Sequence, residues 1–325
     1  MSLSPSLRRR LFAGLTLAAA IGSASLAQAE TQLRIGYQKS STLISLLKAQ
    51  GTLEQRLAKQ DVKISWHEFP NGLPLLEALN VGNVDLSADV ADTVPVFAQA
   101  AGARLTYFAQ EAPSPAAQAI VVPADSKLQK LGDLKGKKIA VTKAAGSHYL
   151  LIAALEKAGL KFSDIEPAYL SAADGRAAFE NGKVDAWVTW EPFLSGVQRQ
   201  LKTRTLADGK GLAAYQRYYL AATPYAQAHP QVLAEVFDAL RETGQWLKAH
   251  PQQAAATLGP LWGGLDADTV VQANGRRSYE VRAVKPENLS EQQKIADAFL
   301  AAGLLPKKVD ALDVDLWKPA QHVQR

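Results

Sequence analysis

A short unit of sequence occurs twice in this chain, 100 positions apart, and it constrains the fold more than any other feature. The copies are Gly82-Asn83-Val84-Asp85-Leu86 and Gly182-Lys183-Val184-Asp185-Ala186. Each follows a helix-like run and leads into an apolar segment that ends at an acid and a proline. Glycine can end a helix, valine begins a buried strand, and the acid with its proline suits the next helix start. The repeat therefore predicts two similar α/β lobes.

The N-terminus has the pattern of a secretory signal peptide. A basic head at Arg8-Arg9-Arg10 precedes an apolar run from Leu11 to Leu26 and the small-residue site Ala27-Gln28-Ala29. This order predicts that residues 1–29 form a cleavable signal and that the mature chain begins at Glu30. The run is too short and too rich in small residues for a stable membrane anchor. We expect a secreted protein without a lipid anchor, since no cysteine stands at the cleavage site.

Composition excludes several kinds of function. The 325 residues include no cysteine, so neither disulfides nor thiol chemistry is possible. The formal net charge is +5, and three of these charges are the arginines of the predicted signal, which leaves +2. That is too mild to indicate nucleic-acid or membrane binding. We also expect no cofactor and no metal, because none of these histidines has the spacing of a metal site: His67, His229, His250 and His322.

Apolar patterns predict alternating strands and helices along the chain. Strands are expected at 33–38, 62–69, 104–109, 119–122, 139–142, 165–170, 204–206 and 218–222. Helices are expected at 43–57, 73–80, 94–101, 148–158, 251–258, 267–273 and 290–302, with others from 173 and from 224. Such alternation favours parallel strands with right-handed crossovers.

A break at Ala112-Pro113-Ser114-Pro115 indicates that the chain leaves the first lobe there, and Tyr218 to Ala222 reads as a strand that returns to it. We expect lobe 1 to comprise 30–112 plus 218–325 and lobe 2 to comprise 113–217. Ligands of open parallel sheets bind beyond the carboxyl ends of the strands, where helix N-termini also point. The turns expected there carry mostly uncharged donors, which suit a small anion.

Several segments resemble the aliphatic sulfonate binding proteins, within the periplasmic solute-binding proteins for sulfonate, taurine and nitrate. They are Leu33 to Lys39, Phe69 to Val84, Phe97 to Ala103, Asp133 to Lys138, Gly146-Ser147-His148, Val184 to Trp187, Trp190-Glu191-Pro192 and Leu305 to Asp310. The resemblance spans nearly the whole mature chain. It implies an α/β fold of the two-lobed type II periplasmic binding protein kind, each lobe a mostly parallel sheet flanked by helices. It also implies a monomer in the periplasm that passes its ligand to a membrane permease driven by an ATPase.

A sulfonate stays ionised at physiological pH, so its site needs hydrogen-bond donors, and an arginine would add charge. The candidate ligand-binding residues, from the resemblance and from the turns, are Gln38, Asn71, Gly72, Asp92, Thr93, Gly146, Ser147, His148, Trp190, Glu191, Arg276 and Arg277. Trp190 is expected to pack over the ligand's carbon chain, and Trp187 to be core. Asp85 and Asp185 are expected to brace the backbone.

Two alternatives stay open from the sequence. The segment Ser87 to Val94 differs from the corresponding segment of its relatives because it carries Asp89 and Asp92. These two acids could repel an anion or bind an amine on the ligand. The alternative ligands are taurine, nitrate or a pyrimidine precursor. An enzyme is the alternative class, but similar enzymes that cleave carbon–sulfur bonds use a cysteine, which this chain lacks. Ser147 and His148 are sequence neighbours, which does not place hydroxyl against imidazole. We therefore expect a carrier.

Overall fold

The computed structural model describes residues 31–319. The predicted signal peptide and His322 lie outside the described residues. Among residues 31–319, no helix has the length and apolar character needed to cross a membrane.

The described chain forms two sheets. The seven-stranded sheet has the order β11-β4-β10-β3-β1-β2, with β12 beside β4. Its strands are β1 (Thr31–Tyr37), β2 (Val62–Glu68), β3 (Leu86–Ala91), β4 (Leu105–Glu111), β10 (Arg217–Ala222), β11 (Val281–Arg282) and β12 (Asp315–Leu316). The five-stranded sheet has the order β7-β6-β8-β5-β9. Its strands are β5 (Gln118–Pro123), β6 (Lys138–Val141), β7 (Glu166–Tyr169), β8 (Ala186–Trp190) and β9 (Thr203–Asp208). Each sheet is the centre of one lobe, so the two-lobed α/β prediction is confirmed.

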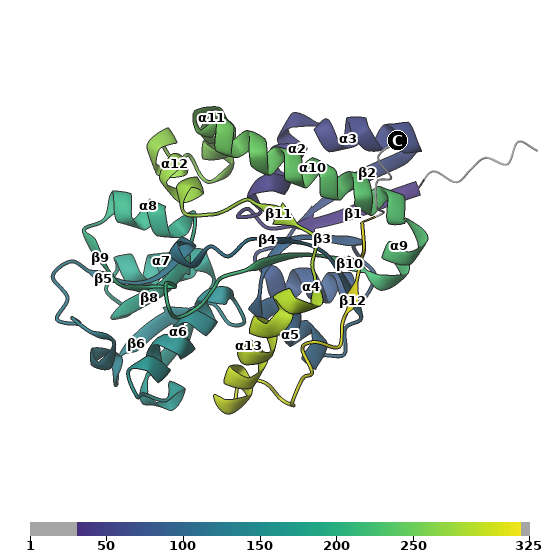
Figure 1. The fold of residues 1–325 in the computed structure, drawn as a ribbon. Coiled ribbons are helices and arrows are strands. Elements are labelled where there is room, and N and C mark those ends of the chain that lie inside the picture. The colour runs from purple at the N-terminus through teal and green to yellow at the C-terminus, as the bar shows by residue number, and fades with distance from the viewer. Residues whose placement is uncertain (1–30, 320–325) are drawn as a thin grey trace, which may run out of the picture. The chain divides into compact units, whose positions relative to one another are not determined.

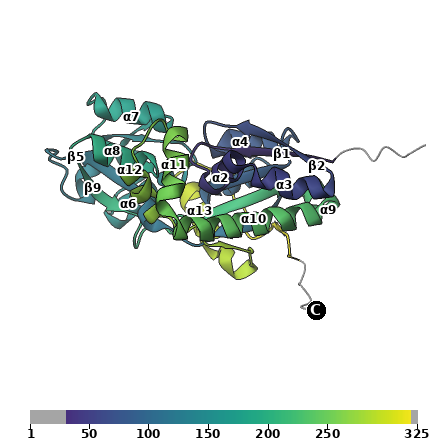
Figure 2. The same cartoon turned by 90° about the horizontal axis from the view of Figure 1, so that it is seen from above.

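Helices flank both sheets (Figure 1). The first lobe has α2 (Thr42–Gln50), α3 (Thr52–Leu57), α4 (Gly72–Asn80) and α5 (Thr93–Ala100), and the second has α6 (Gly146–Lys157), α7 (Ala172–Glu180) and α8 (Phe193–Gln200). After the return strand come α9 (Thr223–Ala228), α10 (Pro230–Ala249), α11 (Pro251–Leu261), α12 (Ala267–Gly275) and α13 (Ser290–Ala301). Short 3-10 helices occupy Ala58–Gln60, Pro115–Ala117, Leu131–Leu134, Phe162–Asp164 and Pro286–Leu289. Figure 2 shows α10 running alongside α2 and α3, against which it packs.

The single helix predicted for 43–57 is wrong. Gly51 adopts a left-handed backbone with φ 64°, and its N–H donates to the carbonyl of Lys48 at 3.3 Å. This conformation ends α2, and α3 begins at the next residue.

The repeated unit forms the same helix-to-strand turn in each lobe. Gly82 and Gly182 end α4 and α7 with φ values of 74° and 63°. Three residues after each glycine, Asp85 Oδ2 accepts from the backbone N–H of Arg34 at 2.8 Å, and Asp185 Oδ2 accepts from that of Lys138 at 2.8 Å. Both aspartates thus tie the start of one strand to its neighbour, which confirms their bracing role.

The expectation of mostly parallel sheets is only partly right, because both sheets are mixed. β1 runs parallel to β3, and β6 runs parallel to β7 and β8. β10, however, is antiparallel to β3 and β4, and β5 is antiparallel to β8 and β9. β5 and β10 are the first strands after the chain changes sheets. No helical crossover precedes either one, so the rule that favours parallel pairing does not apply to them.

Apolar packing fills both lobes and continues between them. Trp187 is 1% exposed and packs with Phe179 and Leu194 in the second lobe, which confirms its core assignment. α13 packs against both α5 and α6. Its Phe299 meets Phe97 with ring centroids 4.9 Å apart. The C-terminal part of the chain therefore contacts both lobes.

Candidate functional site

A cleft lies where the turns of the two lobes face each other. Its free volume is about 20 Å³, room for roughly one water-sized group. The lining residues come from both sheets: Gln38, Asn71, Gly72, Leu73, Ala91, Val94, Thr142, Lys143, Ala144, Ala145, Gly146, Trp190, Tyr215 and Arg217. A wider hollow of about 290 Å³ adjoins it and shares Asn71, Leu73, Thr142 and Lys143 with the cleft.

Five of the residues predicted from the sequence line this cleft: Gln38, Asn71, Gly72, Gly146 and Trp190. Asn71 caps α4, with Oδ1 accepting from the Leu73 N–H at 3.1 Å, so its amide nitrogen is the part left to donate. Gly72 and Gly146 are the first residues of α4 and α6. The unpaired N–H groups and the positive dipole ends of two helices therefore meet at one place, which favours an anion.

Arg217 is a cleft residue that sequence reasoning missed. It is the first residue of β10, 3% exposed, and its guanidinium donates to the Tyr215 hydroxyl at 2.8 Å and to the Asp89 carbonyl at 3.0 Å. Burial is the largest single influence and lowers the pKa of Arg217, but the nearby acidic groups, led by Asp89, together outweigh it and raise the pKa above its ordinary value. The one sequence signal was a charge at the start of an otherwise apolar strand. Lys143 supplies a second cation to the lining.

Ser147 and His148 lie behind the cleft wall rather than on it. His148 is fully buried, and its Nδ1 accepts from the Ala144 N–H at 3.2 Å. Its ring packs against Phe162 and Phe299 at 5.2 and 5.0 Å. This burial lowers the pKa of His148 to about 3, so the ring is neutral near pH 7. The buried Ser147 hydroxyl has no partner within residues 31–319.

Asp92 and Thr93 lie at the start of α5. Thr93 lines no part of the cleft, but its hydroxyl donates to the Ala144 carbonyl at 2.6 Å and so joins the two lobes. The Asp92 carboxylate accepts from the Gln216 N–H at 2.9 Å. Burial raises the pKa of Asp92 to about 7, against these backbone hydrogen bonds and the charge of Arg217.

Glu191 and Arg276 form an ion pair of 2.6 Å between the end of β8 and the end of α12. Glu191 is 3% exposed and also accepts from the Ser195 N–H and hydroxyl at 3.0 and 2.8 Å. Burial raises the pKa of Glu191, while Arg276 acts in the opposite direction. The pair therefore ties the second lobe to the C-terminal part of the first.

Arg277 is buried in the first lobe, with Asp89 at 2.9 Å and Glu111 at 2.7 Å. It also donates to the Ser40 carbonyl and the Thr42 hydroxyl, each at 3.2 Å. Neither it nor Arg276 lines the cleft. The two acids that set this sequence apart, Asp89 and Asp92, are likewise engaged inside the first lobe and do not line the cleft.

Comparison with known proteins agrees with this geometry. The family described as NMT1/THI5-like matches residues 57–254. The chain belongs to this family. A protein of Escherichia coli named as a putative aliphatic sulfonates-binding protein is 42% identical over 290 residues, 89% of each chain. One of the same name from Bacillus subtilis is 30% identical over 286 residues, 87% of this chain and 85% of the relative. The resemblance to the sulfonate binding proteins is thereby confirmed.

Solved structures match this NMT1/THI5-like protein over most of its length. The alkanesulfonate-binding protein of Xanthomonas axonopodis, solved bound to MOPS, gives a TM-score of 0.81 at 41% identity and covers 86% of this chain and 96% of its own. The periplasmic aliphatic sulphonate binding protein of Escherichia coli gives 0.80 at 42%, covering 88% and 97%. A desulfurization enzyme at 15% identity, with a TM-score of 0.63 and coverage of 86% and 95%, shares the fold alone.

In the described part of the chain, the cleft of this NMT1/THI5-like protein is lined by hydrogen-bond donors and cations but by no carboxylate. Its described lining contains amide donors, helix N-termini and two cations, together with apolar groups such as Leu73, Val94 and Trp190. No aspartate or glutamate is among these lining residues. Residues 31–319 also contain no group of three or more His, Asp or Glu placed to hold a metal ion. The arrangement suits an anionic head with an uncharged organic tail.

Proposed function

We propose that the protein is the periplasmic binding component of an ABC importer, which captures aliphatic sulfonates in the cleft and delivers them to a permease for sulfur supply. The observation that carries this proposal is the convergence of two helix N-termini and Arg217 on a lining that has no carboxylate. Relatives named for sulfonate binding, 30% and 42% identical, support it.

The free volume of about 20 Å³ is too small for a sulfonate, so the lobes would have to open to admit one, and each part of it would then meet a counterpart among the lining residues. The amides of Gln38 and Asn71 and the N–H groups at the starts of α4 and α6 would donate to the sulfonate oxygens, and Arg217 would supply charge. Trp190 would pack against the first carbons of the tail. A longer tail would extend into the adjoining hollow, where Pro74 and Tyr169 provide apolar surface.

The alternative ligands fit less well. The ammonium group of taurine needs an acceptor, but Asp89 is paired with Arg217 and Arg277, and Asp92 accepts from Gln216. Glu77 lines the adjoining hollow and is exposed there. Nitrate has no tail for the apolar lining. We therefore propose a preference for uncharged alkyl tails.

An enzymatic role is disfavoured by the same residues. The chain has no cysteine nucleophile. The Ser147 hydroxyl has no partner among the described residues, and the His148 nitrogen that is engaged accepts from the Ala144 N–H. No base is therefore positioned to activate that serine. We propose a carrier that releases its ligand unchanged.

The organisation proposed for the chain follows the sheet membership of its strands. Lobe 1 would comprise 30–112 plus 218–325 and lobe 2 would comprise 113–217, since β5 to β9 form one sheet and the other strands form the second, with Arg217 at the start of β10 marking the boundary. We further propose that residues 1–29 are removed on secretion and that the mature protein is a monomer. Mass spectrometry of periplasmic protein would test the cleavage site, and light scattering would test the monomer.

Calorimetric titration tests the ligand. The mature protein should bind methane-, ethane- and butanesulfonate with micromolar or tighter affinity, about 8 kcal/mol or more, and taurine more weakly. A best affinity for sulfate or nitrate would overturn the proposal. Asn71→Asp retains the cap acceptor of α4 but adds a negative charge to the cleft, so it should abolish binding at a nearly unchanged melting temperature. Asn83→Asp, which adds the same charge at an exposed turn, is the matched control.

A further inference from the structure

We propose that Asp89 positions the anion-binding groups of the cleft, an inference that rests on the proposed function. Asp89 lies in β3 and is fully buried. Its Oδ2 accepts from Arg217 Nε at 2.5 Å. Its backbone carbonyl accepts from Arg217 Nη2 at 3.0 Å and from Gln38 Nε2 at 3.3 Å. Two donors of the cleft lining are thus held by one residue that does not itself line the cleft.

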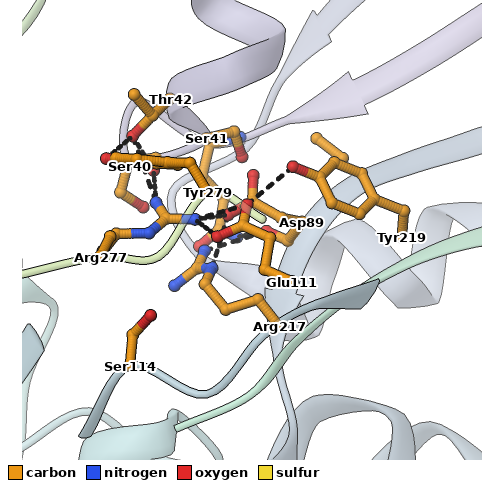
Figure 3. Close-up of polar contacts among 12 residues, drawn as sticks. Ser40, Ser41, Thr42, Asp89, Glu111, Ser114, Arg217, Tyr219, Arg277 and Tyr279 are labelled. Atoms are coloured by element: carbon orange, nitrogen blue, oxygen red, sulfur yellow. Dashed lines mark hydrogen bonds and ion pairs between the residues drawn. The ribbon is translucent and has the colours of Figure 1, made fainter. Parts of the chain in front are cut away.

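The charge of Asp89 is balanced within a buried network (Figure 3). Its Oδ2 also accepts from Arg277 Nη2 at 2.9 Å, and that nitrogen donates to both oxygens of Glu111, at 2.8 and 2.7 Å. Two arginines and two carboxylates make the group neutral overall. Buried charges are tolerated when they are paired in this way. Within the network Asp89 is the carboxylate that bonds to the Arg217 guanidinium, whereas the Glu111 carboxylate bonds to Arg277 and Tyr219 and Glu111 lies opposite Arg217 in the β4–β10 ladder.

The contacts of Arg217 leave some of its N–H donors for a ligand. The group has five N–H donors, of which one is on Nε and two are on each Nη. Asp89 takes the Nε donor and one from Nη2, and the Tyr215 hydroxyl takes one from Nη1. One N–H remains on each Nη nitrogen. An arginine with an uncommitted N–H on both Nη nitrogens can donate to two oxygens of one anion.

Removal of the Asp89 charge has two opposite effects on anion binding. The site gains a net positive charge, which attracts an anion, but Arg217 loses the contact that fixes its orientation. The geometry favours the second effect, because a guanidinium binds bidentately only when its edge faces the anion. Loss of the carboxylate should therefore weaken binding although the net charge rises.

Three variants that change the net charge equally separate these effects. Asp89→Leu removes the acceptor, Asp89→Asn keeps a neutral acceptor, and Glu111→Gln neutralises the carboxylate that bonds to Arg277 and Tyr219 rather than to the Arg217 guanidinium. Calorimetry with ethanesulfonate should show affinity weakened about 10- to 100-fold in Asp89→Leu and less in Asp89→Asn. Glu111→Gln should bind ethanesulfonate within about threefold of wild type, even if its melting temperature falls as much as that of Asp89→Leu.

A pair of double variants decides the question if the single ones do not fold. Asp89→Leu with Arg277→Met and Glu111→Met with Arg277→Met both restore neutrality, but only the second keeps the Asp89–Arg217 contact. Equal affinity in the two, or Asp89→Leu binding as tightly as Glu111→Gln, would overturn the role of Asp89. If the wild type prefers sulfate or nitrate, the proposed function fails, and the same comparison made with that anion still decides the role of Asp89.

Discussion

Gly146→Ala should act as a wedge between the lobes. An added β-carbon would lie 2.6 and 2.7 Å from two ring carbons of Tyr215 and 3.1 Å from the β-carbon of Ala91. Carbon atoms in contact are about 3.5–4.0 Å apart, so one side must move by about 1 Å. The Tyr215 ring cannot swing aside easily, because it is buried and its hydroxyl accepts from Arg217. The Tyr215 ring packs with Ala91 of β3 in one apolar cluster, whereas Gly146 belongs to α6, so separation of α6 from that cluster relieves the clash.

The wedge should therefore oppose closure around a ligand more than it opposes folding. Overpacking of this kind costs about 1–3 kcal/mol, which corresponds to roughly 5- to 150-fold in the dissociation constant. Calorimetry with ethanesulfonate and a melting curve measure the two effects separately. Gly275→Ala is the matched control, since no atom lies within 4 Å of its added β-carbon. Unchanged affinity in Gly146→Ala, or a large loss of melting temperature at wild-type affinity, would refute this reasoning.

Three further variants test other contacts. Arg276→Ala leaves the buried Glu191 carboxylate without its ion-pair partner and removes a tie between lobes, so both melting temperature and sulfonate affinity should fall; no change in either would contradict this role. Folding raises the pKa of Asp92 from 3.8 to about 7. The contribution of Asp92 to the free energy of unfolding is therefore fully present below pH 3.8 and is lost as the pH rises through 7. The total loss is about 4 kcal/mol. Asp92→Asn should remove that component from denaturant titrations across this range, and an unaltered pH profile would count against it. Asp185→Ala removes the brace to Lys138 and should cost about 0.5–1.5 kcal/mol of unfolding free energy, with ethanesulfonate affinity unaffected.

The lobes were predictable because their signals are local. Gly82 and Gly182 end helices by their own backbone freedom, and the aspartates three residues later bond to neighbouring strands in the same way. The direction of β5 and β10 was not predictable from such signals. It depends on how the chain crosses from one sheet to the other, which no single segment encodes.

The candidate site likewise contains residues that local sequence signals predict and residues that they do not. Gln38, Asn71 and Gly146 were found because a residue that follows a strand, or begins the next helix, lies at the sheet edge. His148 was misjudged as a donor because adjacent helix positions differ by about 100°, so a side chain two positions after Gly146 points away from the cleft into the core. Arg217 was missed because its position depends on β10 lying between β3 and β4, a pairing of distant segments.

The two segments that join the sheets are hydrogen-bonded to each other. The Gly209 N–H donates to the Pro115 carbonyl at 3.0 Å, and the Ser114 N–H donates to the Ala214 carbonyl at 3.0 Å. A double connection of this kind bends about one axis more readily than it twists. The lobes should then open and close by rotation about a single axis. The ligand-bound protein would present its two lobes to a transporter in one defined relative orientation.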